Sequence, residues 1–310
     1  MYSVTQQAGG PSGPDAKNGP SIEKANSMSR VFHPYAAAHE LRVADDYRSL
    51  LADKDFIKRV IREVGALIEE RGITTLSFDV FDTALMRSTH SEARRFHAVA
   101  NQFAEKNKNR FTATDALVAR AMAARAAYTF ANAADDGTRE GTMTMIAKIT
   151  CAELGVPNMT NEYIKTELAF EQQHLSVNTL IVSIISAFPS VRTIFLSDMY
   201  LESPYIKKLL QKSFGRSTEV VSSADGFGSK RCGGLFGFAA KHFDLNPSNV
   251  LHFGDSLESD FRQAKRHGMQ AYFLPISDAE RTARKDCYRS LGTQLAPSGI
   301  KLESFLSFNC

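Results

Sequence analysis

Five short apolar stretches alternate with helix-forming segments along much of this chain. Stretches rich in β-branched and aromatic residues lie at 73–78, 191–196, 219–223, 249–253 and 270–274. Continuous apolar runs of this length are typical of strands that are buried in a parallel sheet. Between the later strands, segments 203–214, 235–243 and 259–267 are predicted helices. Strands alternating with helices predict an α/β fold with a doubly wound, Rossmann-like parallel sheet.

Two further regions have a helical pattern. From Ala44 to Glu70 the apolar residues recur at helical spacing, and Arg71-Gly72 supplies a C-terminal stop. Helix formers also dominate at 92–106, 114–134, 142–154 and 161–187, where we expect no strand comparable to the five above. We therefore predict leading helices at 36–72, a sheet domain formed by 73–88 and 189–285, and a helical insertion at 89–188.

The two ends of the chain are less patterned. Residues 1–35 are rich in glycine and proline and contain few large apolar side chains, so we expect disorder. A solvated tail is the simplest interpretation, and a non-cleaved signal for a specialised secretion system is the alternative. We expect the tail at 286–310 to form a helix or two on the core, and we assign it no role.

Composition narrows the class of protein. The chain of 310 residues has a net charge of only +3, which argues against a nucleic-acid partner. Its four cysteines form no CxxC pair, which argues against a zinc site and a disulfide framework and favours the reducing cytoplasm. No apolar run is long enough for a membrane span, and no standard secretory signal begins the chain.

Polar residues with chemical potential follow three of the predicted strands. Asp79 follows the first strand, Ser197 the second along the chain, and Asp255 and Asp260 come after a third. The carboxyl ends of parallel strands meet at one edge, where α/β proteins bind ligands. Lys230 lies between the last two of these strands. A carboxylate nucleophile, a hydroxyl, a lysine and further acids suit Mg²⁺-assisted phosphoryl chemistry.

The order and spacing of these residues resemble the haloacid dehalogenase-like (HAD) superfamily of hydrolases. The runs FDVFDT (78–83) and FLSDMYL (195–201) are similar to a bacterial subgroup of predicted HAD hydrolases, some of them fused to or encoded near glycosyltransferases. The match extends from about Ile73 to Pro275. The resemblance implies a HAD core whose helical cap is the insertion after the first strand motif.

The resemblance also implies a role for each matched residue. Asp79 is the expected nucleophile, which becomes an aspartyl-phosphate, and Ser197 and Lys230 are expected to bind the phosphoryl oxygens. Further substrate contacts are expected from Thr83, Asp198 and Arg87. Arg120 and Arg125 of the insertion are additional candidates for gripping an anionic substrate, although exposed helix faces often carry arginine without such a role.

A magnesium ion is the cofactor that the resemblance implies. Its expected ligands are Asp79, Asp255 and the backbone carbonyl of Phe81, since Mg²⁺ prefers hard oxygen ligands. Asp260 is expected beside the ion, where it would orient Lys230 or a metal-bound water.

One position departs from the pattern of the phosphatases in this superfamily. They carry a second aspartate two residues after the nucleophile, which protonates the leaving group, and here that residue is Phe81. Asp82, where these enzymes usually have glycine, is the nearest candidate to replace it, although its side chain should point in a different direction. Loss of a general acid typically lowers the rate about 10²–10⁴-fold.

Three functions stay open at this point. A Mg²⁺-dependent phosphatase or phosphotransferase acting on a small phosphorylated metabolite or sugar phosphate is preferred. The first alternative is a catalytically weak HAD scaffold that serves as a binding module or secreted effector. The second is a metal-independent, dehalogenase-like hydrolase, since those enzymes also lack the second aspartate. None of the motifs indicates a particular substrate or oligomeric state.

Overall fold

A computed structural model describes residues 36–108, 110–215 and 218–308, so the expectation for segment 1–35 lies outside the described residues. Three leading helices precede the sheet: α2 (Ala36–Val43), α3 (Tyr47–Ala52) and α4 (Lys54–Arg71). The Asp53 carboxylate accepts hydrogen bonds from the first free amides of α4. Gly72, at φ 61°, ends α4 in the left-handed conformation, which confirms the predicted stop.

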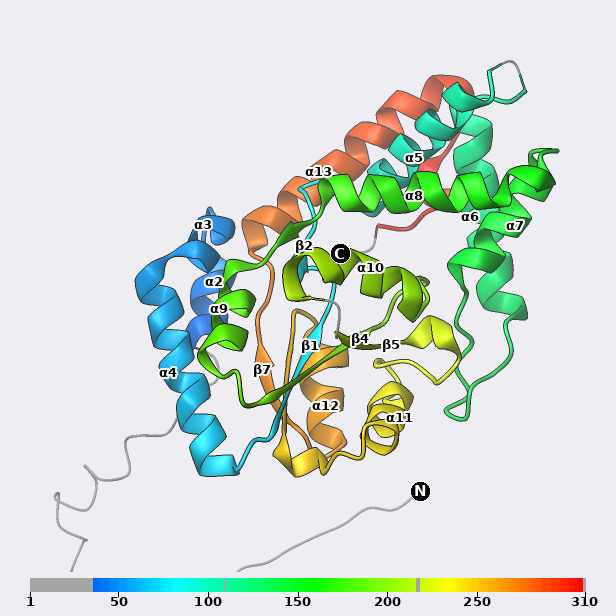
Figure 1. Cartoon of the computed structure of the whole chain (residues 1–310). Helices are drawn as coiled ribbons and strands as arrows, with labels where there is room; N and C mark the ends of the chain where they lie inside the picture. Colours follow the sequence, from blue (N-terminus) through cyan, green and yellow to red (C-terminus); the bar gives the residue numbers. More distant parts are fainter. Residues whose placement is uncertain (1–35, 109, 216–217, 309–310) are drawn as a thin grey trace, which may run out of the picture. The chain divides into compact units, whose positions relative to one another are not determined.

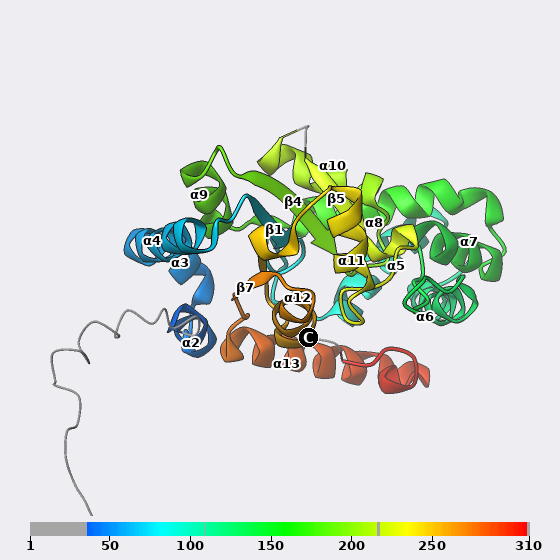
Figure 2. The same ribbon diagram turned by 90° about the horizontal axis from the view of Figure 1, so that it is seen from below.

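The core is a five-stranded parallel sheet with the order β5-β4-β1-β6-β7. All five predicted strands are present: β1 (Thr75–Asp79), β4 (Arg192–Ser197), β5 (Glu219–Ser222), β6 (Val250–Gly254) and β7 (Gln270–Phe273). Helices α9 (Thr179–Ala187) and α10 (Ser203–Phe214) cover one face, and α11 (Gly234–His242) and α12 (Gln263–Arg266) cover the other (Figure 2). The doubly wound α/β prediction is confirmed.

The central strand β1 is buried along its length and ends in an acidic residue at its carboxyl end. Every residue of β1 is buried, and the Phe78 ring stacks on Phe253 of β6 with 4.8 Å between centroids. Aromatic pairs of this kind stabilise a sheet beyond the area they bury. Strand β4 lies beside β1 (Figure 1), and the parallel register sets Asp79 beside Leu196, so Ser197 follows at the same edge.

Four α-helices of the described residues lie between Met86 and Ser176: α5 (Glu92–Lys106), α6 (Ala113–Phe130), α7 (Met143–Glu153) and α8 (Thr160–His174). We call them the helical insert. A short antiparallel pair, β2 (Leu85–Met86) with β3 (Ser176–Val177), joins the points where the chain leaves and re-enters the sheet domain. Two-residue strands are too short to give a sequence pattern, so this pair was not predicted.

A buried hydrogen bond from the sheet domain to an ion pair of the insert connects the two parts. Arg120 of α6 donates to Glu167 of α8 at 3.1 Å, and the Tyr200 hydroxyl donates to the same carboxylate at 2.7 Å. Tyr200 belongs to the loop after β4, and the Arg120 guanidinium lies 4.8 Å from its ring centroid. Arg120 therefore has a structural role in the buried interior, and it does not line the cleft described below.

The predicted helix at 259–267 has a different form. The chain makes a π-helical turn over Leu257–Arg262 and only then the short α12. Both the Asp260 and Phe261 amides donate to the Ser256 carbonyl, which widens the turn. As a result the Asp260 carboxylate lies against the backbone of Gly254, where an added Cβ would lie 2.2 Å from its Cγ.

The C-terminal helix α13 (Asp278–Leu295) crosses the predicted boundary between core and tail. It packs against α2 at one end and α5 at the other (Figure 1). Short 3₁₀ turns are also present along the chain, at Pro157–Met159, Ser223–Asp225, Pro247–Asn249, Ala296–Ser298 and Leu302–Ser304. Within the described residues, no helix is both long and apolar enough to span a bilayer.

Candidate active site

An open cleft of about 390 Å³ lies at the carboxyl edge of the sheet, beneath the insert. It is lined by acidic side chains on one side and by cationic ones on the other. The lining residues that bear on the chemistry are Asp79, Phe81, Asp82, Arg87, His90, Arg95, Asp198, Lys230, Asp255, Asp260 and Arg284.

Lys230 is the centre of the acidic side. It is 2% exposed, and its ammonium donates to Asp79 and, at 2.6 Å, to Asp260. The backbone amides of Lys230 and Arg231 donate to the two oxygens of Asp198, which fixes the loop. The structure thus brings Asp198 to the lysine loop.

A residue of the insert also contacts this loop. The Asp136 carboxylate accepts a hydrogen bond from the Ser229 amide at 3.1 Å and one from the Thr138 amide at 2.9 Å. It fills the space where a side chain at Gly228 would lie, and Gly228 has φ 93°. The sequence predicted only a loop at 135–137, so this contact is a finding of the structure.

Asp260 is held by several donors. Its Oδ1 lies 3.2 Å from Nε2 of His252, whose Nδ1 in turn lies 2.9 Å from the Ser77 hydroxyl. The Ser256 amide donates to Oδ2 at 3.0 Å. Burial opposes the charge on Asp260, but the Lys230 ammonium and the His252 hydrogen bond prevail and hold its pKa below the usual range.

The pKa values of Asp79 and Asp255 are shifted in the opposite direction, upward. Burial, opposed by the Lys230 charge, raises the pKa of Asp79 to about 7. Burial and the Asp79 charge raise the pKa of Asp255 well above its ordinary value. Oxygens of Asp79, Asp255 and Asp260 lie within 4.8 Å of one another. Excess negative charge on hard oxygen donors fits a divalent cation such as Mg²⁺.

Two hydroxyl groups complete this edge of the site. Ser197 is fully buried, and its hydroxyl has no hydrogen-bond partner in the part of the chain that the structure describes. Buried hydroxyls are nearly always paired, so one without a partner beside a cleft favours a bound ligand. Thr83 is also fully buried and helps to lower the pKa of Asp79.

The loop after β1 has an unusual backbone at Asp82. This residue has φ 62°, in the left-handed region that favours glycine. Its carboxylate accepts two hydrogen bonds from Arg284, at 2.8 and 2.7 Å, and burial is overcome so that its pKa falls to about 2. Phe81 lines the cleft, and the Arg87 guanidinium lies 4.2 Å from its ring centroid.

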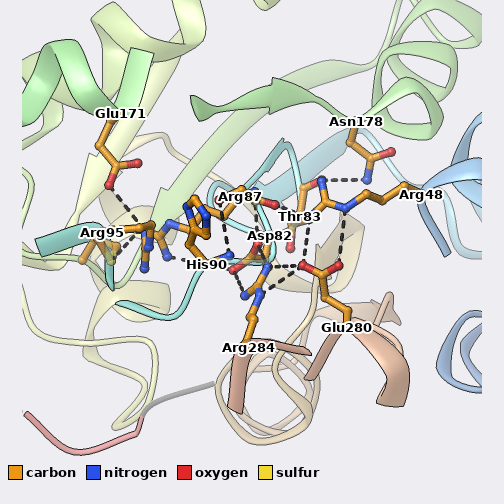
Figure 3. Close-up of polar contacts among 12 residues, drawn as sticks. Arg48, Asp82, Thr83, Arg87, His90, Arg95, Glu171, Asn178, Glu280 and Arg284 are labelled. Atoms are coloured by element: carbon orange, nitrogen blue, oxygen red, sulfur yellow. Dashed lines mark hydrogen bonds and ion pairs between the residues drawn. The ribbon is translucent and has the colours of Figure 1, made fainter. Parts of the chain in front are cut away.

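Figure 3 shows a row of ionisable side chains along the cationic side, from Glu171 through Arg95, His90 and Arg87 to Asp82 and Arg284. Of these residues, Arg87 and Asp82 were expected from the sequence, whereas Glu171, Arg95, His90 and Arg284 were missed. A signal for Arg284 existed: Glu280, Arg284, Tyr288, Leu291 and Leu295 share one buried helical stripe. Arg125, another sequence candidate, is exposed and donates to the Ser304 carbonyl instead.

Comparisons with known proteins give structural matches alone. No family model matches this chain, and no curated protein matches it either. A 2-haloacid dehalogenase from Pseudomonas syringae pv. tomato matches with 12% identity and a TM-score of 0.49, covering 64% of this chain and 85% of its own. A structure described as the HAD-hydrolase YfnB from Bacillus subtilis, bound to magnesium, matches with 16% identity and a TM-score of 0.40. The match covers 71% of this chain and 99% of the YfnB chain.

A third match is described as a phosphoglycolate phosphatase from Lactobacillus delbrueckii subsp. bulgaricus, at 14% identity, a TM-score of 0.36 and coverages of 68% and 97%. The descriptions of the first two matches name the family that the sequence motifs resemble. At these identities and TM-scores, however, the matches carry no argument about activity, so a function for this chain has to follow from its own residues.

Proposed function

We propose that the protein is a Mg²⁺-dependent phosphatase or phosphotransferase that acts through an aspartyl-phosphate on Asp79. The observation that carries this proposal is the meeting of three carboxylates and a buried lysine at one sheet edge. Asp79, Asp255 and Asp260 offer oxygens within 4.8 Å of one another, and the Lys230 ammonium bonds two of them. Such a set suits transfer of a dianionic phosphoryl group.

Asp79 is the proposed nucleophile. Its carboxylate oxygen attacks phosphorus, the bond to the leaving oxygen breaks, and water then hydrolyses the aspartyl-phosphate. Lys230 stabilises the charge that develops on the phosphoryl oxygens, and the Ser197 hydroxyl donates to one of them. Both groups are already held by the sheet edge, which lowers the entropy lost when the substrate binds.

The metal ligands we propose are Asp79, Asp255 and the Phe81 carbonyl, with Asp260 beside them. A bound Mg²⁺ would supply charge neutralisation for the phosphoryl group and for these acids. Because Lys230 and His252 already bond Asp260 Oδ1, we assign Asp260 mainly to orienting Lys230.

We further propose that the helical insert acts as a cap that restricts water and selects the substrate. A cleft of about 390 Å³ suits a small phosphorylated metabolite or sugar phosphate. The composition supports a protein of the cytoplasm, with export through segment 1–35 as the alternative.

A dehalogenase-like reaction without metal is the second candidate. The observation that favours it is Phe81, because a halide leaves without a proton and needs no acid at that position. Such a reaction would release halide from a 2-haloacid in EDTA, whereas phosphoryl transfer would stop there.

The test is steady-state hydrolysis of p-nitrophenyl phosphate with Mg²⁺, with EDTA and with Asp79→Asn. We expect activity only with Mg²⁺ and with Asp79 present. Halide release in EDTA would favour the second candidate instead. A folded protein that binds Mg²⁺ yet turns over neither substrate would contradict both reactions and leave a binding scaffold.

A further inference from the structure

The cationic side of the cleft holds two arginines whose charge is poorly matched. Arg87 is 8% exposed and Arg95 is 6% exposed, and in the described residues the Nε of each has no hydrogen-bond partner. Their nearest carboxylates are Asp82, at 4.0 Å from Arg87, and Glu171, at 3.4 Å from Arg95. Tight charged hydrogen bonds measure about 2.7–2.9 Å, so neither pair is well formed.

The other two buried cations that line the described part of the cleft, Lys230 and Arg284, have close carboxylate partners. Lys230 bonds Asp79 and Asp260, and Arg284 bonds both oxygens of Asp82. Arg87 and Arg95 also repel one another, and that repulsion, added to burial, lowers the pKa of Arg95. Buried charge with only a distant or incompletely bonded partner is costly, and a bound anion would relieve the cost at both side chains.

The place of Arg87 suggests which part of a substrate carries this anion. The Arg87 guanidinium lies over Phe81, two residues after Asp79, where an acid would be needed to protonate a leaving group. Arginine does not give up a proton at neutral pH, but it stabilises a departing oxygen that keeps its negative charge. Asp82 is not free to act as the acid, because both of its carboxylate oxygens accept hydrogen bonds from Arg284.

We propose that the cleft is built for a substrate whose leaving group departs as an anion, bound by Arg87 and Arg95. The chemical class is a phosphoric anhydride or an acyl phosphate. This proposal rests on the proposed function. Asp79 forms the new bond to phosphorus, the electron pair of the broken bond stays on the leaving phosphate or carboxylate, and no proton is required. Water then attacks the aspartyl-phosphate, and its proton goes to the released inorganic phosphate.

The experiment compares four probes at saturating Mg²⁺: pyrophosphate, acetyl phosphate, p-nitrophenyl phosphate and propyl phosphate. The aryl phosphate tests the proposed function alone, since p-nitrophenolate needs little protonation and spreads its charge over the ring and nitro group, so it offers the arginines no phosphate or carboxylate. We expect kcat/KM for pyrophosphate or acetyl phosphate to exceed that for propyl phosphate at least about 10²-fold, the usual contribution of a general acid. Which of the two is preferred distinguishes the anhydride from the acyl phosphate.

Variants then test the two arginines. In Arg87→Met and Arg95→Met we expect kcat/KM for the preferred probe to fall about 10–100-fold, the range for a lost charged hydrogen bond. The loss on p-nitrophenyl phosphate should be smaller. Arg87→Lys, which keeps the charge, should recover part of the loss. Arg125→Met is the matched control, since Arg125 is exposed on the insert outside the cleft.

The outcomes separate the two proposals. If p-nitrophenyl phosphate is hydrolysed with Mg²⁺ and Asp79, but propyl phosphate matches pyrophosphate and acetyl phosphate, the leaving-group proposal is wrong and the phosphatase stands. Equal losses on all probes in Arg87→Met and Arg95→Met also overturn it. Absence of turnover with every probe overturns both proposals.

Discussion

The pair formed by Asp82 and Arg284 gives the sharpest quantitative prediction for this chain. Replacing Arg284 with methionine removes a guanidinium that is 7% exposed and bonds both Asp82 oxygens. The Asp82 carboxylate, 9% exposed, would then be left with Arg87 at 4.0 Å as its closest ion-pair partner. Glu280 would keep its contact with Arg48 at 2.9 Å, so most of the loss concerns Asp82.

The size of the effect follows from two estimates. Lowering the Asp82 pKa from 3.8 to about 2 corresponds to about 2–3 kcal/mol of folding free energy at neutral pH. Breaking a buried ion pair by removing one partner costs about 3–5 kcal/mol. We therefore expect Arg284→Met to lower the free energy of unfolding by about 3 kcal/mol. Because the folded pKa is depressed, this contribution is present above pH about 4 and is lost as pH falls towards 2.

Urea denaturation of the single and double variants measures the coupling. In an Asp82→Asn background, Arg284→Met should cost only about 1 kcal/mol, which gives a coupling energy of about 2 kcal/mol. Asparagine tolerates the left-handed backbone at this position. Arg281→Met, an exposed change on the same helix, is the control. Equal costs in the two backgrounds, within about 0.5 kcal/mol, would refute the reasoning.

Three further predictions concern Ser197, Asp136 and Glu140, a residue outside the cleft that accepts a hydrogen bond from Ser223. Ser197→Ala should leave the urea midpoint unchanged or slightly higher, because it removes a buried unpaired hydroxyl, while kcat falls about 10-fold or more; a clear loss of stability would show that the hydroxyl has a partner. Burial raises the pKa of Glu140 to about 7, so stability should decline as pH rises from about 4.5 to 7, by about 1–2 kcal/mol after solvent screening. Glu140→Gln should flatten that decline in urea titrations at pH 5 and 8, and an unchanged slope would count against it. Asp136→Ala, which frees the Lys230 loop, should lower kcat about 3–10-fold with little change in KM, and an effect on KM alone would contradict this role.

Much of the fold was predictable because its signals are local. The strands β1, β4 and β6 are apolar runs that end in acids or hydroxyls, and a parallel sheet with that order brings those ends together. The structure does bring Asp79, Lys230, Asp255 and Asp260 to one edge. The roles assigned to these residues stay predictions until the kinetic tests are made.

The features that could not be predicted depend on contacts between residues that are far apart in the sequence. Arg284 reaches Asp82 across about two hundred positions, and nothing near either residue indicates the pairing. Asp136 resembles an ordinary loop residue until the insert folds over Gly228. The helix predicted at 259–267 is wrong in its first turn, which is π-helical. The Ser256 carbonyl accepts hydrogen bonds from two successive amides there, an effect that helix propensity does not include.

The buried junction between Arg120, Glu167 and Tyr200 has a consequence for substrate traffic. Opening the insert would leave the Arg120–Glu167 pair intact, because both residues belong to the insert, but it would break the Tyr200 hydrogen bond to Glu167, at a cost of about 1.5–3 kcal/mol. Such an opened form would make up about one molecule in 10–10². In most molecules a substrate therefore meets the cleft with the insert closed over the sheet edge.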